Sequence, residues 1–174
     1  MDMKKGLKSN IVLGIIFVSV LGTLFHFIYE WSGNNVLVGL FAPVNESIWE
    51  HTKLMFFPML IYSVYLNKQA GDKYPCITSA MLLGTLSGVA LIIILFYTYS
   101  GIIGTRFSFV DISIFYISVI TAFYIVYKAT ISCSADKYKR LLQLLTVALI
   151  GLYIIFTFFP PDIALFANPL AISE

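Results

Sequence analysis

The charge-free stretch PCITSAMLLGTLSGVALIIILFYTY, residues 75–99, decides the fold class of this chain. About 20 apolar residues are enough for an α-helix to cross the hydrocarbon core of a bilayer, and this stretch contains 25 residues without one Asp, Glu, Lys or Arg. Gly84 and Gly88 within it form a G-x-x-x-G pattern, which lets a neighbouring helix approach closely. The stretch therefore predicts a membrane-spanning helix that packs tightly against a partner.

The composition of the whole chain agrees with a membrane protein. Of its 174 residues 59% are apolar and 11% are charged, whereas soluble domains have roughly 45–50% apolar and about 25% charged residues. The net charge of +2 is small, and no group of Lys and Arg is interleaved with aromatic residues as on a nucleic-acid-binding surface. Composition therefore predicts the lipid bilayer as the partner and excludes nucleic acid.

Four further apolar stretches flank the charge-free one. Together they predict an all-α fold, a bundle of five transmembrane helices that forms a single integral membrane domain over residues 1–174. We expect Asn45 to cap the second helix, with Glu46 in its first turn, and Pro58 to kink it. The predicted helices are 10–31, 45–66, 75–99, 107–127 and 141–159, with a helix-breaking loop at 32–44 and an outer tail at 160–174.

The distribution of basic residues predicts the orientation, because Lys and Arg near span ends are retained in the cytoplasm. With a cytoplasmic N-terminus and an outer C-terminus, the outer loops contain Arg106 alone. Cys76 and Cys133 then lie near the reducing cytoplasm, where we expect free thiols. The inner segments contain nine basic residues: Lys4, Lys5, Lys8, Lys68, Lys73, Lys128, Lys137, Lys139 and Arg140.

Ionisable side chains gather in the half of the bundle that is predicted to face outward. Each such group costs at least about 2.5–3.5 kcal/mol near the bilayer centre, which makes it a candidate for function. Glu50 and His51 on the second helix are the first-choice binding groups, and they point about 100° apart around the helix. Their predicted partners are His26, Glu30, Glu46 and Asp111, with Lys53 as charge balance.

Two hypotheses for this group are a packing device and a metal site. In the first, Glu50 with Lys53, and an acidic residue with Arg106, neutralise one another. In the second, imidazoles and carboxylates bind a divalent metal ion such as zinc, and a metal-activated water would suit a membrane-embedded hydrolase. No H-E-x-x-H motif supports a protease. The candidate metal ligands are His26, Glu30, Glu50 and His51.

A third hypothesis is a carrier. Glu50 or Asp111 would take up protons in a proton-coupled carrier, or in the substrate-binding subunit of a transporter. Five helices without an internal repeat are few for a transporter that works alone. The metal and carrier hypotheses both predict a polar pocket that binds a cation or a small polar ligand. The sequence leaves the reaction, if there is one, open.

Residues 45–53, NESIWEHTK, carry a likeness to a known family. With Pro43 before them and His26 and Glu30 upstream, they resemble small bacterial integral membrane proteins of unknown function that share an Asn-Glu-Ser-x-Trp-Glu-His-x-Lys motif. The resemblance implies a bacterial cytoplasmic membrane but no activity. In that family the tail after the last helix often carries a histidine, where this chain has Asp162.

Overall fold

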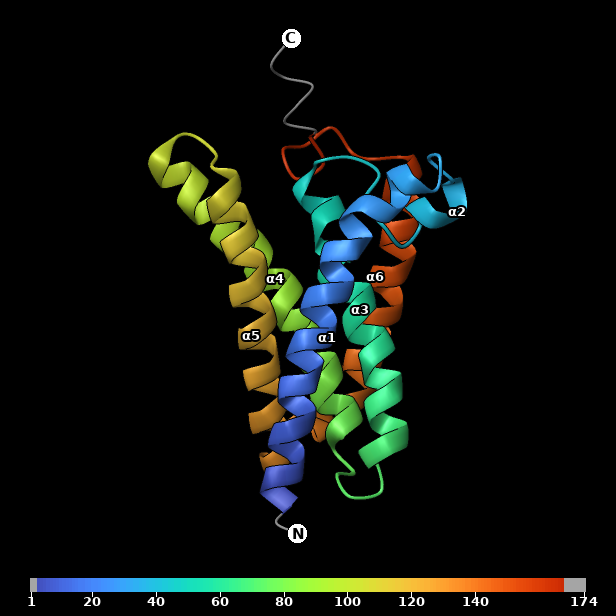
Figure 1. Cartoon of the computed structure of the whole chain (residues 1–174), viewed down its shortest axis with the longest axis vertical. Coiled ribbons are helices and arrows are strands. Elements are labelled where there is room, and N and C mark those ends of the chain that lie inside the picture. The colour runs from blue at the N-terminus through green and yellow to red at the C-terminus, as the bar shows by residue number, and fades with distance from the viewer. Residues whose placement is uncertain (1–2, 168–174) are drawn as a thin grey trace.

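In the computed structural model, which describes residues 3–167, the chain is a bundle of helices without a strand in this range (Figure 1). The all-α prediction is therefore confirmed. Residues 168–174 of the predicted tail lie outside the described residues. The long helices are α1 (Met3–Trp31), α3 (Ile48–Ala70), α4 (Ile77–Ile103), α5 (Ser108–Ser132) and α6 (Lys139–Phe158), and the short ones are α2 (Val36–Gly39) and the 3-10 helix η1 (Asp136–Tyr138).

Four helices within residues 3–167 are long and apolar enough to cross a membrane: α1, α4, α5, and α6 together with η1. The five predicted spans are thus not all confirmed, because α3 does not meet this criterion. Its sequence includes Glu50, Lys53 and Lys68, which lower its hydropathy. Most of α3 is nevertheless buried against the other helices, so its polar side chains lie inside the bundle.

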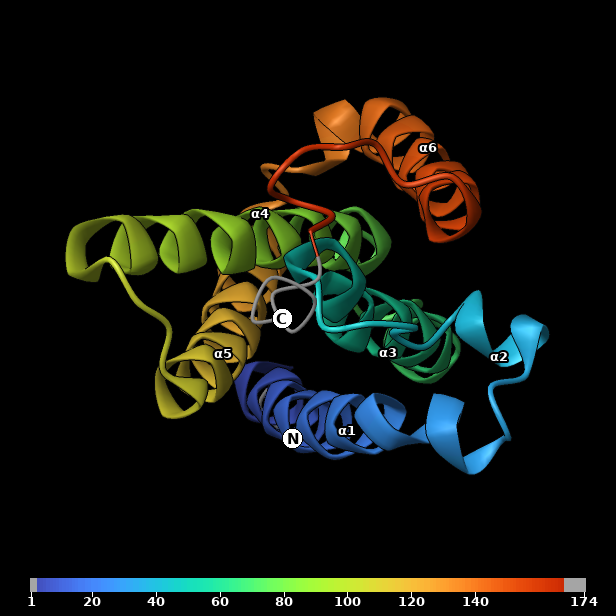
Figure 2. The same cartoon turned by 90° about the horizontal axis from the view of Figure 1, so that it is seen from above.

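The helices pack with α3 near the middle, in contact with α1, α4 and α6, while α4 and α5 form a long antiparallel hairpin (Figures 1 and 2). The glycines of the charge-free stretch lie at these contacts. A Cβ on Gly84 would lie 2.9 Å from the backbone oxygen of Ala122 on α5, and one on Gly88 would overlap Met55 of α3. The predicted close packing at the G-x-x-x-G pattern is therefore confirmed.

Pro58 lies inside α3 and has no backbone N–H to donate to the carbonyl of Leu54. The neighbouring helix α1 comes close at that same carbonyl: a Cβ on Gly22 would lie 2.5 Å from the Leu54 oxygen. In a membrane protein, neighbouring helices cover backbone groups that a proline leaves free. Gly22 therefore allows α1 to cover the defect that Pro58 creates.

The start of α3 differs from the prediction. Ser47, not Asn45, caps the helix, because the Ser47 hydroxyl accepts a hydrogen bond from the Glu50 N–H at 3.3 Å. The Asn45 side chain instead accepts from the Ser47 N–H at 2.9 Å, in a turn before the helix. Glu46 consequently lies in this turn rather than in the first helical turn. Ser47 and Glu50 have the Ser-x-x-Glu spacing of a capping box, but the Ser47 N–H donates to Asn45 and the Glu50 carboxylate accepts from the Val44 N–H, so only the serine half of the box is formed.

Cys76 and Cys133 form a disulfide bond, so the expectation of free thiols is wrong. Cys76 directly precedes α4 and Cys133 directly follows α5. Because α4 and α5 run antiparallel, these two positions meet at the same end of the hairpin (Figure 1). This is also the end at which the N-terminus and the lysine-rich connections lie.

Candidate metal site

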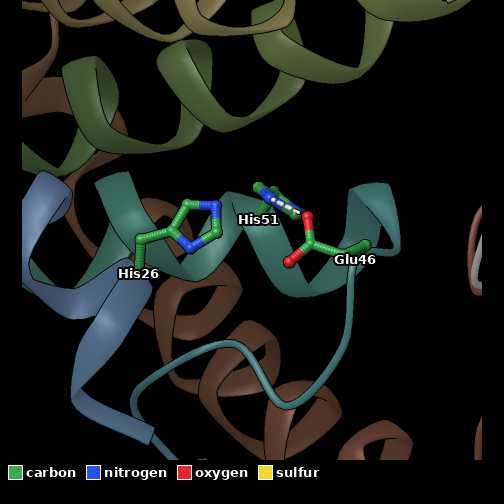
Figure 3. Close-up of side chains that lie close together, drawn as sticks. All are labelled: His26, Glu46 and His51. Atoms are coloured by element: carbon green, nitrogen blue, oxygen red, sulfur yellow. Dashed lines mark ion pairs between the residues drawn. The ribbon is translucent and has the colours of Figure 1, made fainter. Parts of the chain in front are cut away.

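The candidate site lies at the end of the bundle opposite the N-terminus. The chain has two histidines, His26 on α1 and His51 on α3, and their rings meet edge to face with centroids 5.1 Å apart. Glu46, from the turn before α3, points at the same place (Figure 3). One ligand atom from each of the three residues lies within 4.8 Å of the others. We call His26, Glu46 and His51 the His–Glu site.

The two ring nitrogens of His51 have different partners. Nδ1 lies 2.9 Å from the backbone oxygen of Ser47. A carbonyl oxygen only accepts hydrogen bonds, so this contact assigns a proton to Nδ1. Nε2 lies 3.2 Å from a carboxylate oxygen of Glu46. With a proton on Nε2 this contact is an ion pair. Without that proton, Nε2 can offer its lone pair to a metal ion, while the Ser47 carbonyl holds the ring in place.

The pKa of the Glu46 carboxyl group is lowered by its neighbours. The hydrogen bond from His51 is the largest influence on its carboxyl group and lowers the pKa below the ordinary 4.5, against the opposing effect of partial burial. The positive charges of nearby groups act in the same direction as the hydrogen bond. The site thus offers two imidazoles and one carboxylate, which is a ligand set that zinc accepts.

The His–Glu site forms part of the wall of a cavity of about 850 Å³ between α1, α3, α4 and α5. On the opposite wall, Arg106 Nη2 donates to Asp111 Oδ2 at 3.2 Å, and the Tyr99 hydroxyl also donates to Asp111. Of the residues predicted to form the site, the structure therefore brings His26, Glu46, His51 and Asp111 to one cavity.

Glu50 and Lys53 lie elsewhere. They form an ion pair of 2.7 Å that is almost completely enclosed, with 2% of Glu50 and 0% of Lys53 exposed. Lys53 Nζ also donates to the Gly39 backbone oxygen at 2.9 Å and to Thr157 Oγ1 of α6 at 2.6 Å, while the Val44 N–H donates to Glu50 at 3.0 Å. This pair joins α3 to α6, to the end of α2 and to the loop that follows α2.

The helical turn explains this separation. Adjacent residues on an α-helix point about 100° apart, so His51 faces α1 while Glu50 faces α6. The arrangement of Glu50 and Lys53 is the one that the packing hypothesis expects. No pattern in the sequence marks Thr157 or the Gly39 carbonyl as the two further partners of Lys53.

Two other acidic groups also lie outside the His–Glu site. Glu30 is exposed in the last helical turns of α1, and Asp162 is exposed in the tail. The tail folds back over the start of α3 on the side of Trp49: the backbone N–H of Trp49 donates to the backbone oxygen of Leu165 at 3.1 Å, and Phe166 packs on the Trp49 ring. Phe166 and Leu165 therefore cover the helix end next to Glu50 rather than the histidines.

The family likeness of residues 45–53 extends to nearly the whole chain. Residues 1–172 match the DUF6512 family, which is described as a family of unknown function. No curated protein and no solved structure matches the chain. Since the match covers nearly the whole chain, the protein belongs to DUF6512, a family of unknown function.

Proposed function

We propose that this chain is a multi-pass membrane protein that binds one divalent transition-metal ion, with zinc as the first choice, at His26, Glu46 and His51. The observation that carries the proposal is that both histidines of the chain, 25 residues apart in sequence, meet a carboxylate with ligand atoms within 4.8 Å. Two histidines and one glutamate form a known zinc ligand set that leaves a fourth position for water or substrate.

The spacing suits a site that closes around an ion. Zinc bonds of about 2.0–2.2 Å in tetrahedral geometry place ligand atoms about 3.3–3.6 Å apart. The His51–Glu46 pair already lies at 3.2 Å, and small side-chain rotations bring in His26. A metal ion would replace the proton between His51 and Glu46, and the Ser47 carbonyl would orient the ring as an outer-shell partner.

The proposal includes five transmembrane helices in a bacterial cytoplasmic membrane, with α3 as the enclosed span. The inner segments carry nine basic residues and the outer loops carry Arg106 alone, which supports a cytoplasmic N-terminus by the positive-inside rule. The His–Glu site then lies in the outer half. The Cys76–Cys133 bond then lies at the cytoplasmic end of the bundle, in a compartment where disulfide bonds are rare.

The test is the metal content of detergent-purified protein, measured by inductively coupled plasma mass spectrometry after dialysis against zinc. We expect one zinc ion per chain in the wild type and loss of that ion in His26→Ala and His51→Ala, with Glu46→Gln also depleted. Glu30→Gln is the matched control, because it removes an exposed carboxylate from the helix that carries His26. Zinc retained in His26→Ala, or lost equally in Glu30→Gln, would contradict the proposal.

A further inference from the structure

We infer that the cavity beside the His–Glu site binds an anionic amphiphile of the phospholipid class, with its phosphate between the metal ion and Arg106. The inference rests on the proposed metal site. A volume of about 850 Å³ is far larger than an ion with a few waters needs, since one water takes up about 30 Å³. Cavities of roughly 300–1,000 Å³ are typical of sites for small organic ligands.

Arg106 has donors left for such a ligand. Its guanidinium carries five N–H donors, of which one nitrogen bonds Asp111, and its Nε is buried without a hydrogen-bond partner in the described residues. The guanidinium lies over the ring of Phe96, 4.6 Å from its centroid, which fixes its plane. Buried donors normally have partners, and a fixed guanidinium fits the paired oxygens of a phosphate.

The charge of the cavity favours an anion once the metal is bound. A divalent ion and Arg106 bring three positive charges, while Glu46 and Asp111 bring two negative charges. The cavity then carries a net positive charge, which a phosphate oxygen on the open zinc position would neutralise. Without the metal, protonated His51 and Arg106 balance Glu46 and Asp111 and the net positive charge is lost, so we expect anion binding to depend on metal binding.

Much of the remaining lining is apolar and reaches the lipid-facing surface. Ile92, Phe96 and Phe115 line the cavity, together with Phe27 of α1 and Ile112 of α5. Phe27 is 44% exposed and Ile112 is 58% exposed, so both line the cavity and also contact the surroundings. The two helices diverge toward this end of the bundle (Figure 1). An acyl chain can therefore extend from the cavity between α1 and α5 into the bilayer.

The test is binding of lysophosphatidic acid to the detergent-purified, zinc-loaded chain. Binding is measured by titration, with native mass spectrometry as the readout. Lysophosphatidylcholine is the zwitterionic comparison, and inorganic phosphate is the headgroup without a chain. We expect lysophosphatidic acid to bind about ten- to a hundredfold more tightly than lysophosphatidylcholine, which is the range for charge-assisted hydrogen bonds. Chelation of the zinc, or Arg106→Gln with its zinc retained, should abolish this preference.

A second variant guards against misfolding of Arg106→Gln. Ile112→Trp, at an exposed position on the cavity rim, should weaken lysophosphatidic acid binding and leave the zinc content unchanged. Equal binding of both lysolipids to the zinc-loaded chain, or inorganic phosphate that binds as tightly as lysophosphatidic acid, would overturn the inference while the metal site stands. Absence of zinc from the wild type would instead overturn the proposed function, and this inference with it.

Discussion

Replacement of Glu50 by glutamine removes one half of the buried ion pair at the start of α3. Lys53 would then keep its contacts with the Gly39 oxygen and Thr157 Oγ1, but its charge would have no counter-charge in an enclosed position. At 2.7 Å and an effective dielectric constant of about 20, the lost attraction is about 6 kcal/mol. Loss of one partner of a buried pair typically lowers stability by about 3–5 kcal/mol.

We therefore expect Glu50→Gln to lower the free energy of unfolding by about 3–5 kcal/mol. The double variant Glu50→Gln/Lys53→Met should recover most of this loss, because it leaves no unpaired charge. The assay is a titration with sodium dodecyl sulfate in which unfolding is monitored by circular dichroism. Glu30→Gln is the control, and a change below about 0.5 kcal/mol is expected for this exposed carboxylate.

The zinc content of Glu50→Gln should remain at the wild-type level, because Glu50 faces α6 rather than the histidines. A loss of stability below about 1 kcal/mol, or a double variant no more stable than the single one, would refute the reasoning about the buried pair. Zinc lost from a variant of unchanged stability would make Glu50 a metal ligand instead.

Three further predictions follow from other parts of the bundle. Gly22→Leu should lower stability by at least about 1–3 kcal/mol in the same titration, because its side chain meets the α3 backbone, while Gly101→Leu, with nothing within 4 Å of its Cβ, should not. Since His51 lowers the pKa of Glu46 below 4.5, their contact stabilises the fold above that pH, and the stability difference between wild type and Glu46→Gln should shrink as the pH falls below 4.5; a constant difference would contradict this. The Cys76–Cys133 disulfide bond should protect both thiols from a permeant maleimide until a reductant is added; thiols that react without a reductant would contradict the bond.

The sequence predicts the helices well because hydropathy marks the hydrocarbon core directly. It predicts their ends less well: α1 begins at Met3 rather than at residue 10, because a helix continues through a lysine-rich flank that hydropathy excludes. The disulfide was not predictable in this way. Pairing Cys76 with Cys133 requires the antiparallel register of α4 and α5, which is a property of packing.

The site was predicted in part. The sequence groups His26 with His51 at one end of the bundle, where the structure brings their rings together, and the helical period separates His51 from Glu50. The period does not say which neighbouring helix each face meets, so Glu50 was grouped with the histidines although it faces α6. Glu30 shares a helix face with His26, but its side chain is exposed. The carboxylate that lies beside the two histidines is Glu46, in the turn before α3.

The most direct test of the central claim is X-ray absorption spectroscopy at the zinc edge of the metal-loaded chain. We expect a single zinc environment of nitrogen and oxygen ligands at about 2.0–2.2 Å, with the multiple-scattering pattern of two imidazoles. A spectrum with sulfur ligands, or with no imidazole scattering, would contradict it.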